Sequence, residues 1–164
     1  MPDNPSAVFF QLFNEIGIIE QLSRTQLEAC LPDGLIAPHF TVLNHLTRVS
    51  DGRAPIDMAR AFQVPKTSMT HTLKVLEAHG LVELKPNPED GRSKLVWLTA
   101  AGRRVRAETI DRLGPDLAAL ADTFDVSRVQ AVLPLLQALR VYLDEARDTR
   151  DGVAKPRALR QPAI

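Results

Sequence analysis

A turn at residues 63–65 separates two short segments of helical periodicity, 55–62 and 66–79, and it limits how the middle of the chain can fold. Pro65 disfavours helical geometry at Val64, so we expect two separate helices rather than one long helix. Two helices joined by a few residues form the outline of a helix-turn-helix.

A β-hairpin is predicted directly after these helices. Gly80 ends the second helix, and the apolar segments 81–85 and 94–98 have the length and composition of short strands. The loop between them contains two prolines and the turn pair Asp90-Gly91, which predict a stiff, protruding tip. Two helices followed by such a hairpin form the layout of a winged helix-turn-helix domain.

The predicted helix 66–79 has one apolar and one polar face. Met69, Leu73 and Leu76 share the apolar face, which we expect to pack on the core. A helix fits the major groove of DNA, where side chains of its first turns reach base edges and phosphates, and its free first-turn amides favour a phosphate. The candidate DNA-contacting residues of this helix are Lys66, Thr67, Ser68, Thr70, His71 and Lys74.

The tip of the hairpin carries a second group of candidate DNA-contacting residues. Arg92 is long enough to enter a narrow minor groove, and Lys94 can neutralise an adjacent phosphate. Asp90 is expected to hold the Arg92 guanidinium by charge-assisted hydrogen bonds and so to restrict its rotamers. Ser93 is expected to add a hydrogen bond to a phosphate. The alternative is that Asp90-Gly91 is turn chemistry alone and that Arg92 is simply solvated.

The distribution of charge agrees with a local anion-binding surface. The whole chain has 20 basic and 20 acidic residues, so its formal net charge is zero. Residues 66–106 hold eight Lys or Arg and four Asp or Glu, a balance of +4, whereas residues 1–65 and 107–164 balance at −3 and −1. Positive charge is thus concentrated around the predicted helix and hairpin, although such an excess also arises by chance on a solvated surface.

Long helices are predicted on both sides of this domain. In residues 6–31 apolar side chains occupy two helical faces, and three of the six Phe lie in residues 9–13. A small domain has few places to surround such a helix, so we expect it to contact a partner subunit as well. Thr99 is predicted to cap the first of two further helices, and bends are expected at Pro115 and Pro134. The expected fold is mainly α with a small β-hairpin wing: a winged helix-turn-helix with N- and C-terminal dimerisation helices.

The sequence resembles the MarR-type transcriptional regulators over nearly its whole length. The run DGRSKLVWLTAAGR is similar to the wing signature of that family, Asp-x-Arg-Ser followed by a strand ending in Leu-Thr-x-x-Gly, and MTHTLKVLEAHGLVEL is similar to its recognition helix and first wing strand. The resemblance implies a homodimer that presents two winged domains to a pseudo-palindromic double-stranded DNA operator. The family's wing residues carry over to Asp90 and Arg92. Its recognition-helix contacts carry over to Thr67, Ser68, Thr70, His71 and Lys74.

The resemblance also implies a domain division and a small-molecule effector. The expected parts are an N-terminal dimerisation helix at 1–35, the DNA-binding domain at 36–99, C-terminal dimerisation helices at 100–148 and an extended tail at 149–164. An effector bound between the dimerisation helices and the winged domain would change the spacing of the recognition helices, so the chain is expected to be an effector-modulated repressor. Candidate lining residues are Phe13, Ile16, His39 and His45, although core packing also accounts for Phe13 and Ile16.

Cys30 leaves open a regulator that responds to oxidants or metals. It is the single cysteine, which excludes an internal disulfide and favours a reducing, cytoplasmic compartment. A reactive thiol needs nearby cations or a helix N-terminus, whereas Cys30 lies near a predicted helix C-terminus beside Glu28, so a small apolar role is favoured. A metal site could in principle combine Cys30, His39 and His45.

An enzyme and a protein-binding module are the remaining alternatives. Ser68 and His71 have the i, i+3 spacing of a nucleophile and base, but the sequence offers no oriented third group, Gly-rich phosphate loop or carboxylate pair, so we expect no enzyme and no cofactor. A winged domain that binds only protein would not need Arg92 with Lys94, and its binding would survive high salt. No apolar run has the length of a membrane span, and no targeting segment is evident, so no membrane partner is expected.

Overall fold

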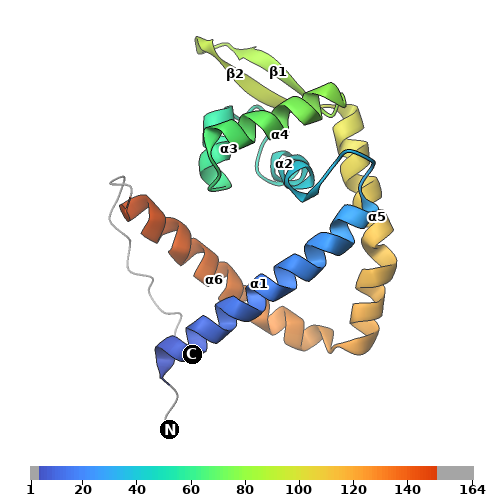
Figure 1. The fold of residues 1–164 in the computed structure, drawn as a ribbon, viewed down its shortest axis with the longest axis vertical. Coiled ribbons are helices and arrows are strands. Elements are labelled where there is room, and N and C mark those ends of the chain that lie inside the picture. Colours follow the sequence, from blue (N-terminus) through green and yellow to red (C-terminus); the bar gives the residue numbers. More distant parts are fainter. Residues whose placement is uncertain (1–3, 151–164) are drawn as a thin grey trace. The chain divides into compact units, whose positions relative to one another are not determined.

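The computed structural model describes the backbone of residues 4–150 and the side chains of residues 4–146. Within them the chain is mainly helical with one antiparallel hairpin, as predicted (Figure 1). The elements are α1 (Pro5–Cys30), α2 (Ala37–Arg48), α3 (Pro55–Ala61), α4 (Lys66–Ala78), β1 (Val82–Asn87), β2 (Asp90–Leu98), α5 (Ala100–Thr123) and α6 (Val126–Arg150). The chain divides into two compact units that meet between Gly114 and Pro115, within α5.

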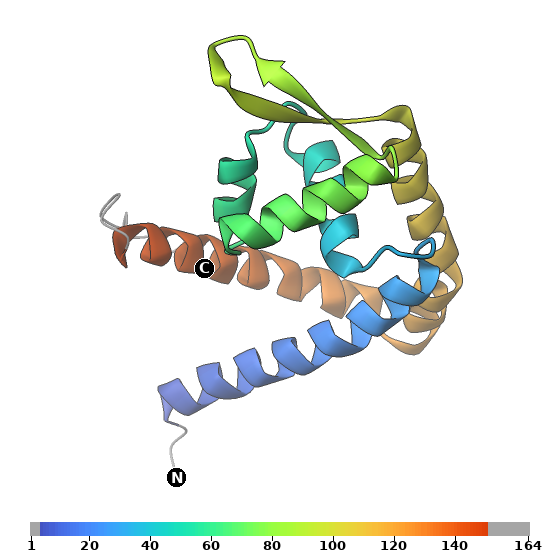
Figure 2. The same ribbon diagram turned by 45° about the horizontal axis from the view of Figure 1, so that its top comes forward.

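The first unit contains an apolar core shared by α2, α3, α4 and the hairpin. The two ribbon views show these helices gathered together, with the hairpin extending from the C-terminal end of α4 (Figures 1 and 2). Met69, Leu73 and Leu76 are each 2% exposed or less, which confirms the predicted apolar face of α4. The other buried apolar residues of this core are Leu31, Leu35, Val42, Leu43, Leu46, Met58, Ala59, Leu81, Val82, Val96 and Leu98.

The hairpin strands are longer than predicted. Their register runs from Val82 opposite Leu98 to Asn87 opposite Asp90, with an irregularity between Pro86 and Asn87. The expected long loop is therefore mostly strand, and only a short tip remains. Pro86 can lie in β1 because a hairpin edge leaves part of the backbone without a ladder partner.

A segment before α3 extends the hairpin at its base, which the sequence did not predict. The Gly52 amide donates to the Val96 carbonyl at 3.0 Å, and the Val96 amide donates to the Arg53 carbonyl at 2.8 Å. Gly52 has a φ of 73°, and a Cβ there would lie 2.8 Å from the Trp97 ring, so this close approach requires glycine.

Asp51 links the base of the hairpin to the start of α5. Its Oδ1 accepts the Leu98 amide at 2.7 Å, and its Oδ2 lies 2.5 Å from Nη2 of Arg103. The Asp51 side chain is only 19% exposed. The carboxylate therefore ties β2, the loop after α2 and α5 together at the foot of the wing.

The C-terminal end of α1 is joined to its surroundings by two hydrogen bonds. Oε1 of Glu28 accepts the first-turn amide of Ala37 at 2.9 Å, and Nη1 of Arg112 donates to the Cys30 carbonyl at 3.1 Å. The rest of α1 keeps apolar side chains exposed on more than one face, as expected for a helix that also contacts a partner. These exposed residues are Val8, Phe9, Phe10, Phe13, Ile16, Ile18, Ile19 and Leu22.

The last two helices are continuous through their prolines. Thr99 caps α5 as predicted, because its Oγ1 accepts the Gly102 amide at 3.0 Å. Pro115 and Pro134 lie inside α5 and α6 without ending either helix. α6 continues through Arg150, and the tail predicted at 149–164 stays a prediction, because residues 151–164 lie outside the described residues. In the described part of the chain, no helix is both long and apolar enough to cross a membrane.

Candidate nucleic-acid interface

The polar face of α4 is exposed along the length of the helix. Its six predicted DNA-contacting residues, from Lys66 to Lys74, are all exposed, while the opposite face is buried in the core. Burial of one face fixes the rotation of α4, so the polar side chains point outward as a set. They supply ammonium, imidazole and hydroxyl groups, which can donate to phosphates and to base acceptors.

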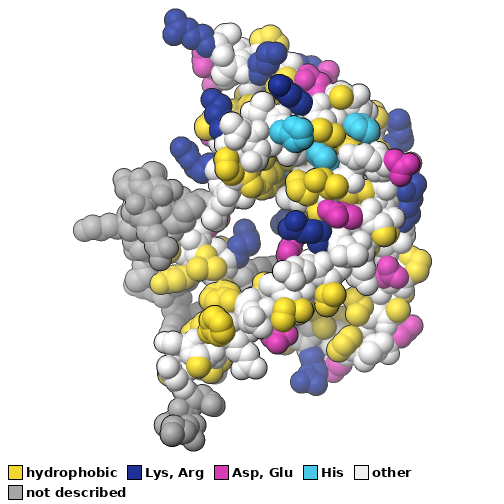
Figure 3. Space-filling view, in the orientation of Figure 1, with side chains coloured by type: hydrophobic (Ala, Val, Ile, Leu, Met, Phe, Trp, Pro, Cys, Tyr) yellow, Lys and Arg dark blue, Asp and Glu magenta, His cyan; other side chains and the backbone are white. Residues whose placement is uncertain are grey.

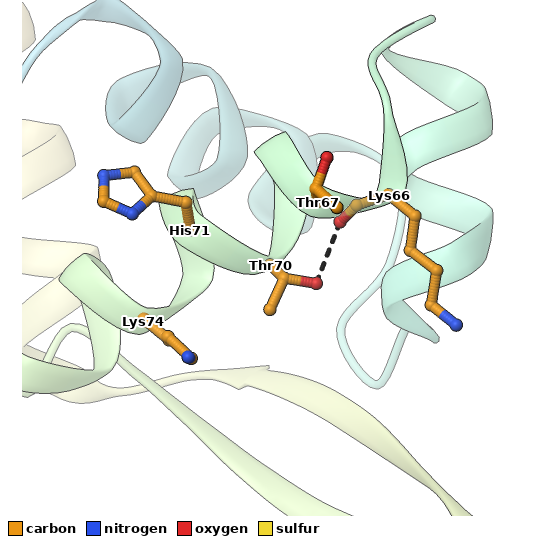
Figure 4. Close-up of a pocket in the computed structure, with 5 residues that line it drawn as sticks. All are labelled: Lys66, Thr67, Thr70, His71 and Lys74. Atoms are coloured by element: carbon orange, nitrogen blue, oxygen red, sulfur yellow. Dashed lines mark hydrogen bonds between the residues drawn. The ribbon is translucent and has the colours of Figure 1, made fainter.

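Five of these side chains border a shallow hollow of about 280 Å³ (Figure 4). The Thr70 hydroxyl donates to the Lys66 carbonyl at 2.8 Å, so its proton is engaged within the helix while its oxygen can still accept. Figure 4 shows the side chains projecting from successive turns of α4. The residues that line the hollow are Lys66, Thr67, Thr70, His71 and Lys74.

The N-terminus of α4 is suited to an anion. Pro65 occupies the N-cap position, and no side chain among the described residues caps this end. Its carbonyl accepts the Met69 amide at 3.1 Å, while the preceding turn is held by the Val64 amide on the Ala59 carbonyl at 3.0 Å. The first-turn amides of α4 are therefore left for an external acceptor such as phosphate.

Asp90 does not hold the Arg92 guanidinium as predicted. Its Oδ1 instead accepts the backbone amide of Arg92 at 3.0 Å, and no ion pair joins the two side chains in the described structure. An Asx-type turn satisfies the carboxylate with the nearest amide, two residues on, which leaves the guanidinium exposed and free to reach outward. Asp90 orients Arg92 through the backbone.

Ser93 is half-buried at the tip, and its hydroxyl is already bonded within the hairpin. The hydroxyl donates to the Asp90 carbonyl at 3.1 Å and accepts from Nδ2 of Asn87 at 3.0 Å. Its predicted hydrogen bond to phosphate would therefore compete with these contacts. Asn87 was not predicted to bond within the wing tip, because a lone Asn before a proline is typical of an ordinary loop. Lys94 is exposed, opposite Pro86 on β1.

Cations follow the same side of the winged domain. Figure 3 shows Lys and Arg side chains at the end of the hairpin and around α4, with histidines close by. Among the exposed basic residues of these elements are Arg92 and Lys94 near the tip of the hairpin, and Lys66 and Lys74 on α4. The two predicted groups of DNA-contacting residues thus lie in one compact unit.

The four candidate effector-lining residues lie on α1 and α2 and differ in exposure. Phe13 and Ile16 are exposed on α1 at 42% and 37%. His39 is 5% exposed, and His45 packs edge-on against Phe62 with ring centroids 4.9 Å apart. The two histidines therefore serve different parts of the winged core, and their role in binding a ligand stays a prediction.

His39 closes the N-terminus of α2. Its Nδ1 accepts the Ile36 amide at 2.9 Å, an arrangement that requires an unprotonated Nδ1. Burial lowers the pKa of His39 below its ordinary value, and His79, just after α4, and His71 of α4 lower it further. His45 has a lowered pKa for similar reasons, namely burial followed by Arg53 and Arg48.

We expect the chain to lose stability as the pH falls below about 6.5, and we expect His39→Gln to reduce this loss. The pKa of His39 in the folded chain lies below 6.5, so the unfolded chain takes up the proton first as the pH falls. The stability that neutral His39 contributes is therefore complete above pH 6.5. It is lost as the pH falls through the folded pKa. Glutamine can still accept the Ile36 amide but does not titrate. Thermal unfolding between pH 7.5 and 5 measures the effect. An unchanged pH slope in the variant would contradict this role of His39.

Other chemistry predicted as an alternative finds little support. Cys30 is half-buried at the end of α1, and no group of three or more His, Cys, Asp or Glu within the described residues can hold a metal ion. The combination of Cys30, His39 and His45 is therefore wrong as a metal site. Ser68 and His71 lie exposed on the surface of α4, without the shielding that a nucleophile and base need.

Comparison with known proteins places this geometry in a family. The MarR family model matches residues 33–93, which include α2, α3, α4 and the wing tip. MarR, the multiple antibiotic resistance protein of Escherichia coli, is 31% identical over 114 residues, which cover 65% of this chain and 78% of MarR. The chain belongs to the MarR family. MarR-family proteins are transcriptional regulators rather than enzymes, which confirms the expectation against catalysis.

Other MarR-family relatives agree in sequence and fold. The transcriptional activatory protein BadR of Rhodopseudomonas palustris is 31% identical over 100 residues, which cover 60% of this chain but only 55% of BadR. The crystal structure of wild-type apo MarR from E. coli aligns with a TM-score of 0.66 at 27% identity, covering 78% of this chain and 96% of MarR. A mutant MarR complexed with operator DNA aligns with a TM-score of 0.67 at 25% identity, covering 84% and 99%.

Proposed function

We propose that the chain is a sequence-specific, double-stranded-DNA-binding transcriptional regulator. The observation that carries the proposal is the exposed polar face of α4 together with the exposed Arg92 at the tip of the wing, in one compact unit. α4 would enter the major groove and Arg92 the adjacent minor groove, with Lys66, Lys74 and Lys94 on phosphates. The fold shared with an operator-bound MarR supports this assignment.

We propose that the regulator acts as a homodimer on a pseudo-palindromic site. α1 exposes a run of apolar side chains that water does not favour, including Phe9, Phe10 and Phe13 at 50%, 75% and 42%. α6 likewise exposes Val129, Leu133 and other apolar residues. Helices of this kind are best covered by the same helices of a second copy, and a two-fold dimer presents two identical winged domains to two half-sites.

Repression is the proposed direction of control, with a small-molecule effector that alters DNA affinity. A dimer seated on an operator blocks access to it, and an effector that favours one spacing of the recognition helices would change its occupancy. Activation is a second candidate, because BadR is named an activatory protein. Deleting the regulator would raise transcription from its operator under repression and lower it under activation. A cytoplasmic location would follow from either role.

The test is a fluorescence titration of the full chain on a duplex from the region upstream of its own coding sequence, at two salt concentrations. We expect saturation at two chains per duplex, tighter binding than to an unrelated duplex of equal length, and affinity that falls steeply with salt because each Lys or Arg on a phosphate displaces a counterion. Equal affinity for both duplexes would contradict sequence-specific binding. Binding that survives high salt would favour the protein-binding alternative.

A further inference from the structure

The side-chain amide of Asn87 forms hydrogen bonds on both sides of the wing tip. Its Oδ1 accepts the Glu89 amide at 3.0 Å, and its Nδ2 donates to the Ser93 hydroxyl at 3.0 Å. Asn87 lies where the hairpin register becomes irregular, and it is half-buried although the tip around it is exposed. Asn87 therefore links Glu89, which follows Pro88, with Ser93 on β2.

Ser93 and Asp90 continue this network around Arg92. The Ser93 hydroxyl donates to the Asp90 carbonyl at 3.1 Å, and the Asp90 carboxylate accepts the Arg92 amide at 3.0 Å. The backbone on both sides of Arg92 is thus fixed, whereas its guanidinium has no partner in the described structure. The direction of this side chain is set by the backbone alone, and the backbone is set by Asn87, Asp90 and Ser93, which we call the tip network.

We infer that Asn87 is a positioning residue for DNA binding, acting through Arg92 by way of the tip network. This inference rests on the proposed DNA-binding function. A tip that is ordered before DNA arrives avoids the loss of backbone entropy on binding, so a guanidinium already aimed outward binds more tightly than one on a mobile loop. Ser93 belongs to the same network, so its hydroxyl acts through the hairpin rather than by binding a phosphate.

Asn87→Ala should lower affinity for the duplex about fivefold to tenfold, since two hydrogen bonds at the tip are lost. Asn87→Ser should restore part of this loss, because a serine hydroxyl can still accept the Glu89 amide. Glu89→Gln is the control: Glu89 enters the network through its backbone amide, which the substitution keeps, so the affinity of this variant should not fall. Hydrogen exchange at the Arg92 amide should quicken in Asn87→Ala, while the melting temperature stays near that of the wild type because the tip lies outside the core.

A double-mutant cycle with Arg92→Ala separates positioning from any other role. If Asn87 acts through Arg92, Asn87→Ala will cause no further loss of affinity once Arg92→Ala is present. A full additive loss in the double variant, or wild-type affinity in Asn87→Ala, would overturn the inference while leaving the proposed function intact. Failure of the wild-type chain to bind any duplex would overturn both.

Discussion

Gly102→Ala should lower the melting temperature of the chain by roughly 10 °C, which corresponds to about 3 kcal/mol of overpacking. A Cβ at Gly102 would overlap the carbonyl oxygen of Leu81 and lie 2.7 Å from Cδ1 of Leu98. The Leu81 carbonyl cannot move away easily, because it accepts both the amide and the hydroxyl of Thr99, each at 3.1 Å. The first turn of α5 must therefore separate from the base of the hairpin.

Gly114→Ala is the matched control in the same helix. Apart from its chain neighbours, a Cβ there meets nothing within 4 Å, so the helix preference for alanine of about 1 kcal/mol is opposed only by the restriction that Pro115 places on the residue before it. Thermal unfolding followed by circular dichroism compares the two variants directly. Equal melting temperatures for Gly102→Ala and Gly114→Ala would show that α5 does not pack on the wing base as described.

The parts of the fold that could be predicted are those with a local signal. Pro65 and the two-faced periodicity of residues 66–79 predicted the helix-turn-helix, because the helical period and the helix break both depend on residues close together in sequence. Thr99 predicted a cap for the same reason. The exposed apolar faces of α1 were also predicted, since the helix carries more apolar residues than one small domain can cover.

The parts that could not be predicted depend on contacts between distant residues. Asp51 precedes Gly52, a pair typical of an ordinary turn, yet its carboxylate accepts the Leu98 amide 47 residues away and pairs with Arg103. Nothing in the local sequence distinguishes such an anchor from turn composition. At the wing tip one predicted contact was wrong: Asp90 was expected to bind the Arg92 guanidinium but accepts the nearer backbone amide, a competition between neighbours that spacing alone does not decide.

Arg92→Ala and Lys74→Ala should each weaken DNA binding substantially. Loss of a minor-groove guanidinium should reduce affinity about tenfold or more, and loss of a phosphate-bound ammonium should also reduce the salt slope by about one per contact. Arg92 lies on the wing and Lys74 on α4, so their effects should nearly add, to about 100-fold in the double variant.

Lys85→Ala is the control on the same hairpin. It removes the same charge, but Lys85 pairs with Glu83 at 2.6 Å and lies over the Trp97 ring, so we expect its affinity to stay within about twofold of the wild type.

The most direct test of the claim that α4 and the wing bind one duplex together is the fluorescence titration of these four variants beside the wild type, with circular dichroism to verify folding. The account predicts large losses for Lys74→Ala and Arg92→Ala, a larger one for the double variant, and almost none for Lys85→Ala. Equal affinities for Lys74→Ala, Arg92→Ala and Lys85→Ala would contradict it, because net charge rather than these two surfaces would then control binding.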